Sequence, residues 1–493
     1  MSTRRYTTRS TGGSSRNAGR EDISDPRGSL AERIISVFKP CDIRGRVGTE
    51  LTEDVAETIA KAFGTALARR GMEKVLVGGD LRPSTPSLKE AAIKGLMSTG
   101  RYVLHLGTIP TPAFYFAKEI LDADAGLMVT GSHNPPSDNG LKIAMGPLPI
   151  TEEELSEIRD IASSGEFIEG KGRVKEVDCL KGYKEFMVER FGPPRRRGMK
   201  IVIDAGNGSY WDIAPDVFGY LGYEVVGLFC EPDGRFPNRG PNPASPENLV
   251  HLQRKVIEEG ADMGIAFDGD GDRVAFVDDK GRIVENDKII AIFVRRLLGK
   301  AGPGAKVVYD IKCSSIVPEE VLRLGGKPIM ERSGHSFIKR RMITEGAIMA
   351  GEISGHFFFG DIGRDDGLFS SLLMADILSE SRKKLSELAD EIKLYPITPD
   401  IRIPSSPEET RRAMEEVKKR FPDRDISTID GIRVQFEDGW ALIRPSVTEP
   451  LITMRFEART EERLEEIKEM FLSWIKIFRE RRGVSFEGRD NGG

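Results

Sequence analysis

The segment MGIAFDGDGDRVAFV, residues 263–277, places three aspartates at alternate positions between two apolar runs. The apolar runs are typical of strands and the glycine-rich centre is typical of a loop. In an extended chain alternate side chains lie on one side, so the carboxylates of Asp268, Asp270 and Asp272 converge. Three like charges repel one another unless a cation lies among them, and carboxylate oxygens favour magnesium or calcium over zinc or copper. A solvated acidic turn is the alternative at this point.

A calcium-binding EF-hand loop is the nearest rival for this motif. Such a loop has glycine at its sixth position and a bidentate glutamate at its twelfth, where this chain has Arg273 and Asp279. An arginine beside a magnesium site favours contact with a substrate anion, because guanidinium pairs bidentately with phosphate oxygens. Magnesium and phosphate therefore become one hypothesis, with Arg273 as a substrate-binding residue.

Composition narrows the function classes. A chain of 493 residues is too long for one compact core and predicts several domains. The formal net charge is −5 and no basic cluster lies in the folded part, so we expect no nucleic-acid partner. The longest apolar runs are strand-sized, so we expect no membrane span. The cysteines are widely scattered, which predicts a reducing, cytoplasmic location and no zinc site; they are Cys41, Cys179, Cys230 and Cys313.

Strand-like and helix-like patterns alternate along most of the chain and predict layered α/β domains. The first predicted helix has Thr52 as its N-cap and precedes a buried strand at residues 75–77. The pattern restarts at two hydrophobic strands that begin at Lys200 and Lys306 and end in aspartate. After Pro396 shorter strands and two amphipathic helices predict a smaller α+β domain.

The predicted fold is therefore three consecutive mixed α/β sheet domains followed by a smaller C-terminal α+β domain. The predicted boundaries are residues 30–180, 181–286, 287–395 and 396–480. Both ends are poor in apolar residues, so we expect disordered tails at residues 1–29 and 481–493. The first tail is rich in Arg and Ser, as organellar transit peptides are, but it lacks an apolar face, which favours a plain tail.

Loops that follow hydrophobic strands are the candidate sites, because ligands bind beyond the carboxyl ends of strands in open α/β sheets. Residues 130–136, TGSHNPP, place the hydroxyl of Ser132 beside the imidazole of His133. The nucleophile elbow of hydrolases needs a glycine where Asn134 stands. A serine on a loop can carry a phosphoryl group where a cation and hydrogen-bond donors neutralise the added charge.

Residues 130–136 together with residues 268–273 resemble the phosphoserine loop and the magnesium loop of the α-D-phosphohexomutases, the phosphomannomutase/phosphoglucomutase group. Residues 351–356, GEISGH, resemble the sugar-binding loop of that family, and residues 444–450, RPSVTEP, resemble its phosphate-binding loop. The resemblance covers about residues 33–480. It implies that the four domains surround a central cleft and that each contributes one loop to it.

The resemblance also implies roles for individual residues. The implied catalytic residues are Ser132 as the phosphorylated nucleophile, Arg44 and Lys142 as groups that move protons, and His133, which shapes the loop. Neighbouring positive charge is expected to lower the pKa of Lys142. The implied ligands of Mg²⁺ are Asp268, Asp270, Asp272 and a phosphoserine oxygen at Ser132. The implied substrate-binding residues are Arg273, Lys312, His335, Glu352, Ser354, His356, Arg444, Ser446, Val447 and Thr448.

The implied function is an isomerase, an intramolecular phosphotransferase that interconverts hexose 1-phosphate and hexose 6-phosphate through a phosphoserine. Hexose 1,6-bisphosphate is the implied intermediate and activator, and a phosphosugar is the small-molecule partner. Mannose and glucose both remain open as the sugar, as does the number of subunits. Phosphoglucosamine mutase is one alternative, although its sugar loop usually has Gln where this chain has Ile353. A non-catalytic phosphosugar-binding relative is the other alternative, and it would lack the serine or an aspartate.

Overall fold

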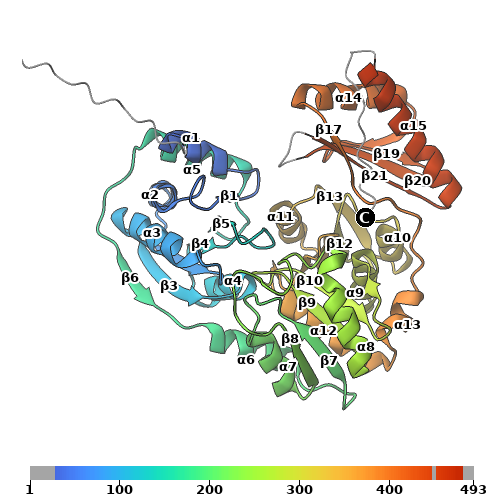
Figure 1. The fold of residues 1–493 in the computed structure, drawn as a ribbon, viewed down its shortest axis with the longest axis horizontal. Helices are drawn as coiled ribbons and strands as arrows, with labels where there is room; N and C mark the ends of the chain where they lie inside the picture. The colour runs from blue at the N-terminus through green and yellow to red at the C-terminus, as the bar shows by residue number, and fades with distance from the viewer. Residues whose placement is uncertain (1–27, 447–450, 481–493) are drawn as a thin grey trace, which may run out of the picture.

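A computed structural model describes residues 28–446 and 451–480, and the side chains of residues 474–480 are outside that description. Most of both predicted tails, and Val447 and Thr448, therefore lie outside the described residues. The described chain forms four sheets in succession along the sequence (Figure 1). Within the described ranges no helix has both the length and the apolar character needed to cross a bilayer.

The first sheet has the strand order β1-β5-β4-β2-β3-β6. Strands β2, β3, β4 and β6 are parallel, whereas β5 is antiparallel to both β4 and β1. The strands are β1 Ile43–Arg46, β2 Lys74–Gly79, β3 Tyr102–Thr108, β4 Ala125–Val129, β5 Asp138–Met145 and β6 Arg173–Glu176. The accompanying helices are α1 Leu30–Val37, α2 Glu53–Arg69, α3 Thr85–Ser98, α4 Thr111–Ile120 and α5 Glu152–Ser164.

The second and third sheets, of order β11-β10-β9-β7-β8 and β13-β12-β14-β15-β16, repeat this plan. The second domain contains α6 Leu180–Phe191, β7 Lys200–Asp204, α7 Ile213–Leu221, β8 Glu224–Leu228, a 3₁₀ helix Pro246–Leu249, α8 Val250–Glu259, β9 Met263–Phe267, β10 Val274–Asp278 and β11 Ile283–Val284. The third contains α9 Asn286–Ala301, β12 Lys306–Asp310, α10 Ile316–Arg323, β13 Lys327–Glu331, α11 His335–Glu345, β14 Met349–Gly351, β15 Phe357–Phe359, β16 Arg364–Asp365, α12 Gly367–Ser381 and α13 Leu385–Asp390.

One topological feature places the candidate loops. In each of these three sheets a parallel strand leads through a loop into its antiparallel neighbour: β4 into β5, β9 into β10, and β14 into β15. The serine loop, the aspartate loop and the sugar loop predicted from the sequence are these three connections. They therefore lie at equivalent positions of three similar sheets.

The fourth sheet is entirely antiparallel, with the order β17-β21-β20-β19-β18. Its elements are β17 Ile401–Pro404, α14 Pro407–Arg420, β18 Asp425–Ser427, β19 Ile432–Phe436, β20 Gly439–Pro445, β21 Leu451–Ala458 and α15 Glu461–Glu480. Figure 1 shows this domain, in orange and red, beside α11 and β13 of the third domain. The predicted class, three mixed α/β domains and a smaller α+β domain, is confirmed.

Local signals in the sequence account for the helix ends and the buried faces. The predicted helix after Thr52 is α2, and its apolar positions Val55, Ile59 and Phe63 are fully buried. Helix α1 was not predicted. It begins with a capping box, in which Ser29 accepts a hydrogen bond from the backbone N–H of Glu32 and the Glu32 side chain bonds back.

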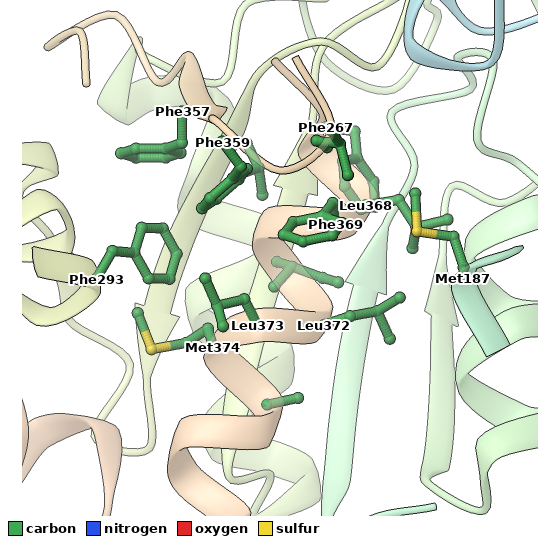
Figure 2. Packing of buried hydrophobic residues seen from close by; sticks show 14 of the residues in the cluster. Met187, Phe267, Phe293, Phe357, Phe359, Leu368, Phe369, Leu372, Leu373 and Met374 are labelled. Carbon is green, nitrogen blue, oxygen red and sulfur yellow. The ribbon is translucent and has the colours of Figure 1, made fainter. Parts of the chain in front are cut away.

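One apolar core extends through the first three domains, and the first domain also has a core of its own. The extended core includes Leu76 of β2, Ile201 of β7 and Val307 of β12. Figure 2 shows part of it, where α12 packs beneath Phe267 and Phe359. The fourth domain has a core of its own and meets the third through Ile311, Trp440 and Leu442. The first three loops are thus held in one packed body, and the fourth loop belongs to a separately packed unit.

Candidate active site

A buried ion pair holds the serine loop in place. Arg82 Nε lies 3.1 Å from Asp80 Oδ2, and both side chains are almost wholly inaccessible. Asp80 also accepts a hydrogen bond from Thr130 Oγ1 at 2.8 Å. The Arg82 guanidinium donates four hydrogen bonds of 2.5 to 3.0 Å to backbone carbonyls of the loop, those of Ser132, Asn134, Pro135 and Asp138. Sequence analysis missed both residues, although a charged pair directly after the buried strand β2 was the available signal.

Ser132 has a constrained backbone and a directed side chain. Its φ is +48°, a left-handed conformation that is uncommon outside glycine. The backbone N–H of Ser132 donates to Thr130 Oγ1 at 2.9 Å, and Ser132 Oγ donates to Asp268 Oδ2 at 3.0 Å. The same Oγ lies 3.2 Å from His133 Nδ1. The nucleophile candidate is therefore in direct contact with the first aspartate of the aspartate loop.

The three aspartates converge as predicted. Carboxylate oxygens of Asp268, Asp270 and Asp272 all lie within 4.8 Å of one another, and all three residues are buried. Asp270 Oδ1 and Asp272 Oδ1 have no hydrogen-bond partner. A Cβ on Gly269 would lie 2.6 Å from the carbonyl oxygen of Ser132, so only glycine allows the two loops to approach this closely. Buried, unpartnered carboxylate oxygens suit a hard divalent cation, and the cluster fits such an ion.

Lys142 of β5 enters the cluster from the first domain. Its Nζ lies 2.8 Å from Asp270 Oδ2 and 2.5 Å from Asp272 Oδ2. Burial alone would lower the pKa of Lys142, but the two carboxylates raise it well above its usual value. The predicted lowering of this pKa is wrong, because the charges nearest to the ammonium are negative. Burial, with the charges of Asp272 and Asp270, raises the pKa of Asp268 well above its usual range. The single positive charge of Lys142 therefore does not neutralise the three carboxylates.

Arg44 and His133 both lie beside the serine. Arg44 lies opposite Gly140 in the antiparallel β1 and β5 pair, and its Nη1 donates to Asn134 Oδ1 at 2.5 Å. Burial, together with the positive charges of Arg273 and Arg44, lowers the pKa of His133 well below its usual value. His133 is therefore neutral at neutral pH, while the arginine is a fixed cation beside the loop.

His356 connects the sugar loop to the aspartate loop. Its Nδ1 lies 2.9 Å from Glu352 Oε2 and 3.0 Å from Ser354 Oγ, and its Nε2 lies 3.3 Å from Asp272 Oδ1. Arg273 Nε lies 3.4 Å from His356 Nε2. The backbones meet as well, because Val274 N donates to the carbonyl oxygen of Gly355 at 3.1 Å. Three of the four predicted loops therefore form one contiguous cluster.

His335 begins α11 and lines a cavity beside this cluster. The cavity has a volume of about 970 Å³ and lies between the first and third domains; Cys41, Lys142 and Lys339 also line it. Burial, aided by the charge of Lys142, lowers the pKa of His335 to about 4. Its Nδ1 is buried without a hydrogen-bond partner. A neutral imidazole facing a cavity is suited to a polar ligand.

The remaining predicted cations lie where the third and fourth domains meet. Lys312 Nζ donates to Asp400 of the fourth domain. Arg444, at the end of β20, lies 3.2 Å from Asp430 Oδ2, which also accepts from the backbone N–H of Ser333. Beyond Arg444, Ser446 N donates to the carbonyl oxygen of Leu451 at 2.9 Å. Neither Lys312 nor Arg444 contacts the serine cluster. Each of these two predicted phosphate contacts is paired instead with a carboxylate of the fourth domain.

Comparison with known proteins identifies the family. The chain matches the phosphoglucomutase/phosphomannomutase α/β/α domains I, II and III at residues 36–169, 181–281 and 285–395, and the C-terminal domain at residues 401–473. The chain belongs to the phosphoglucomutase/phosphomannomutase family. A phosphomannomutase/phosphoglucomutase of Pseudomonas aeruginosa is 40% identical over 446 residues, which cover 90% of this chain and 96% of that protein.

Two further members of the phosphoglucomutase/phosphomannomutase family are similarly close. A phosphoglucomutase of Neisseria gonorrhoeae is 39% identical over 456 residues, covering 91% of this chain and 98% of that protein. The crystal structure of a family protein from Burkholderia thailandensis superposes with a TM-score of 0.84 at 35% identity, covering 91% of this chain and 98% of that one. The similarity extends over all four domains, so no large part of the fold is left without a counterpart.

Proposed function

We propose that this protein is a phosphohexomutase that interconverts hexose 1-phosphates and hexose 6-phosphates, with mannose or glucose as the sugar, through a phosphoserine at Ser132. The observation that carries the proposal is the hydrogen bond from Ser132 Oγ to Asp268, because it sets a nucleophile against a trio of buried carboxylates. Family membership supports the same reaction, since the relatives are named phosphomannomutase/phosphoglucomutase and phosphoglucomutase.

The proposed reaction consists of two phosphoryl transfers. In the first, the bond between phosphorus and Ser132 Oγ breaks and a bond from phosphorus to a sugar hydroxyl oxygen forms, while the hydroxyl proton leaves and Ser132 recovers one. The product is a hexose 1,6-bisphosphate. After the bisphosphate reorients, the second transfer returns its other phosphoryl group to Ser132 by the reverse sequence. The result is isomerisation with no net loss of phosphate.

Most of the catalysis of phosphoryl transfer is charge neutralisation and positioning. Asp268, Asp270 and Asp272, with an oxygen of the phosphorylated serine, would hold Mg²⁺, which offsets negative charge on the transferring group when bound. Lys142 carries a positive charge beside the same carboxylates, and Arg44 supplies another beside the serine loop. We assign the proton movements to these two residues, with His133 shaping the loop.

The other predicted residues are assigned to the sugar and its second phosphate. Glu352 and Ser354 would bind ring hydroxyls, and His356 would hold their loop against the aspartate loop. The phosphate contacts would come from Arg273, Lys312, His335, Arg444, Ser446, Val447 and Thr448. Lys312 and Arg444 are paired with Asp400 and Asp430 here, so a phosphate would have to compete with these carboxylates. Because the fourth domain has its own core, we infer that it moves toward the cluster when a phosphosugar binds.

Steady-state assays with glucose 1-phosphate and mannose 1-phosphate test the proposal. The Ser132→Ala variant should lose nearly all turnover, because no other hydroxyl occupies that position. Ser137→Ala is the matched control, because this exposed serine lies in the same segment and should leave the rate unchanged. Near-normal turnover by Ser132→Ala would refute the nucleophile assignment.

The same assay with glucosamine 1-phosphate tests the principal alternative. Ile353 packs against the apolar core and offers no side-chain hydrogen bond to a sugar amine. We therefore expect the hexose 1-phosphates to have the higher kcat/KM. A clear preference for glucosamine 1-phosphate would overturn the choice of sugar while leaving the phosphoserine chemistry intact.

A further inference from the structure

A buried ion pair behind the sugar loop has no part in the mechanism proposed above. Lys339, on α11, is 6% exposed, and its Nζ lies 3.8 Å from Asp365 Oδ1. The ammonium also lies 3.5 Å from the ring centroid of Tyr115, which belongs to α4 of the first domain. Asp365, in β16, is 1% exposed. Residues from two domains thus enclose the pair.

The pair adjoins His356 directly. Asp365 Oδ2 lies 3.9 Å from His356 Nε2, and the same nitrogen lies 3.3 Å from Asp272 Oδ1. Two carboxylates therefore lie within ion-pair distance of one imidazole nitrogen. The contact with Asp272 connects the sugar loop to the aspartate loop, whereas a closer contact with Asp365 would turn the ring away from it.

Lys339 is paired with Asp365 Oδ1, whereas His356 lies against Asp365 Oδ2. Arg273 approaches the same imidazole nitrogen, with Nε 3.4 Å from His356 Nε2. Arg364, although adjacent to Asp365 in sequence, is directed at Glu119 at 3.4 Å. Asp365 Oδ1, the atom nearest to Lys339, has no hydrogen-bond partner. The charge of Asp365 is therefore balanced by Lys339 on one side and by His356 on the other.

Stability alone gives little reason for this arrangement. A buried ion pair beyond hydrogen-bond distance offsets the cost of desolvation poorly, and an apolar pair of similar volume is often as stable. Burial lowers the pKa of Lys339 to about 8, which reflects that cost. The charge of Lys339 is better explained by its electrostatic effect on Asp365 and His356.

We propose that Lys339 is a positioning residue for the mutase reaction: by neutralising Asp365 it leaves the His356 imidazole paired with Asp272 and Glu352, and so fixes the sugar loop against the aspartate loop. This inference rests on the proposed function, because the sugar loop is taken to grip the substrate. If Lys339 loses its charge, Asp365 becomes an uncompensated buried carboxylate and draws the His356 N–H away from Asp272. The ring hydroxyl contacts of Glu352 would then be misplaced.

A double-mutant cycle tests the proposal. Lys339→Met should lower kcat by about tenfold or more, the scale on which losing a partner that orients a functional histidine acts. Asp365→Asn removes the competing carboxylate and should stay within about threefold of the wild type. The double variant Lys339→Met/Asp365→Asn removes both charges and should recover to within about threefold of the wild type. Lys300→Met, an exposed lysine lining the same cavity, is the control and should be unchanged. Full activity of Lys339→Met, or losses that simply multiply in the double variant, would overturn the proposal.

Histidine NMR at constant pH supplies a readout independent of turnover. The chain has five histidines, so ¹³C-labelled histidine gives few signals, and the His356 signal is assigned by its loss in His356→Asn. Lys339→Met should shift the His356 signal, and the double variant should return it toward the wild-type position. An unmoved His356 signal in a folded Lys339→Met protein would overturn the proposal. If the wild-type protein lacks mutase activity, the proposed function fails and the NMR comparison alone decides the coupling. If Lys339→Met does not fold, Lys339→Gln takes its place in the same comparisons.

Discussion

Replacing Arg82 by methionine should disable the enzyme without touching a catalytic group. The substitution removes four hydrogen bonds to loop carbonyls and leaves Asp80 as a buried, unpaired carboxylate. Breaking a buried pair in this way costs about 3–5 kcal/mol. A shift of about 1 Å in a reacting group lowers rates by about 100-fold. Arg82 bonds the carbonyl of Ser132, the residue with φ of +48°, so we expect its loss to allow such a shift. We therefore expect Arg82→Met to lower kcat by at least tenfold.

The assay combines turnover with hydrogen exchange of the serine loop. Exchange at residues 130–138 should accelerate in Arg82→Met, because their carbonyls lose their partner. Arg82→Lys should be intermediate in stability, since it retains the charge beside Asp80 but not the planar fork that reaches four carbonyls. Arg69→Met, an exposed arginine of the same domain, is the matched control. Normal turnover and unchanged exchange in Arg82→Met would refute the claim that this pair builds the loop.

Three further predictions follow from the site. Arg444→Ala should raise KM by about 10–100-fold with kcat nearly unchanged, because a charge-assisted phosphate contact contributes about 1.5–3 kcal/mol. The control Arg420→Ala, at an exposed position of the same domain, should change neither constant. A large loss of kcat at constant KM would show that Arg444 acts in the chemical step instead. Gly269→Ala should lower the free energy of unfolding by about 1–3 kcal/mol and remove most turnover, because the added methyl group meets a backbone oxygen. The control Gly299→Ala, with open space around its Cβ, should change neither quantity. Equal effects of the two substitutions would contradict the close approach of the two loops at Gly269. Asp270→Asn should raise the Mg²⁺ concentration needed for half-maximal activity by about tenfold or more, and an unaltered requirement would remove Asp270 from the ligand set.

Much of the fold was available from local sequence signals. The helix after Thr52 and the strands flanking the aspartate loop were predicted because capping residues and apolar periodicity are local properties. Helix α1 was missed although Ser29 and Glu32 form a capping box, because its apolar face is only eight residues long and adjoins a polar tail. The exact domain boundaries remain predictions.

The site was predictable where its chemistry lies in contiguous residues. Asp268, Asp270 and Asp272 alternate along one extended loop, so their convergence follows from backbone geometry. The pKa of Lys142 was predicted with the wrong sign because its carboxylate partners are 128 and 130 residues away, and sequence does not show which charges meet. Arg82 was missed for the same reason, because its partners are backbone carbonyls, which every residue possesses.

Peptide mass spectrometry of the full-length protein tests the central claim most directly. The protein is incubated with glucose 1,6-bisphosphate and Mg²⁺, digested, and the peptide that contains Ser132 is compared with the same peptide from Ser132→Ala. We predict one phosphate on Ser132 that is lost when hexose monophosphate is added in excess and is absent from the variant. A peptide that stays unmodified while the protein turns over hexose phosphate would contradict the phosphoserine mechanism.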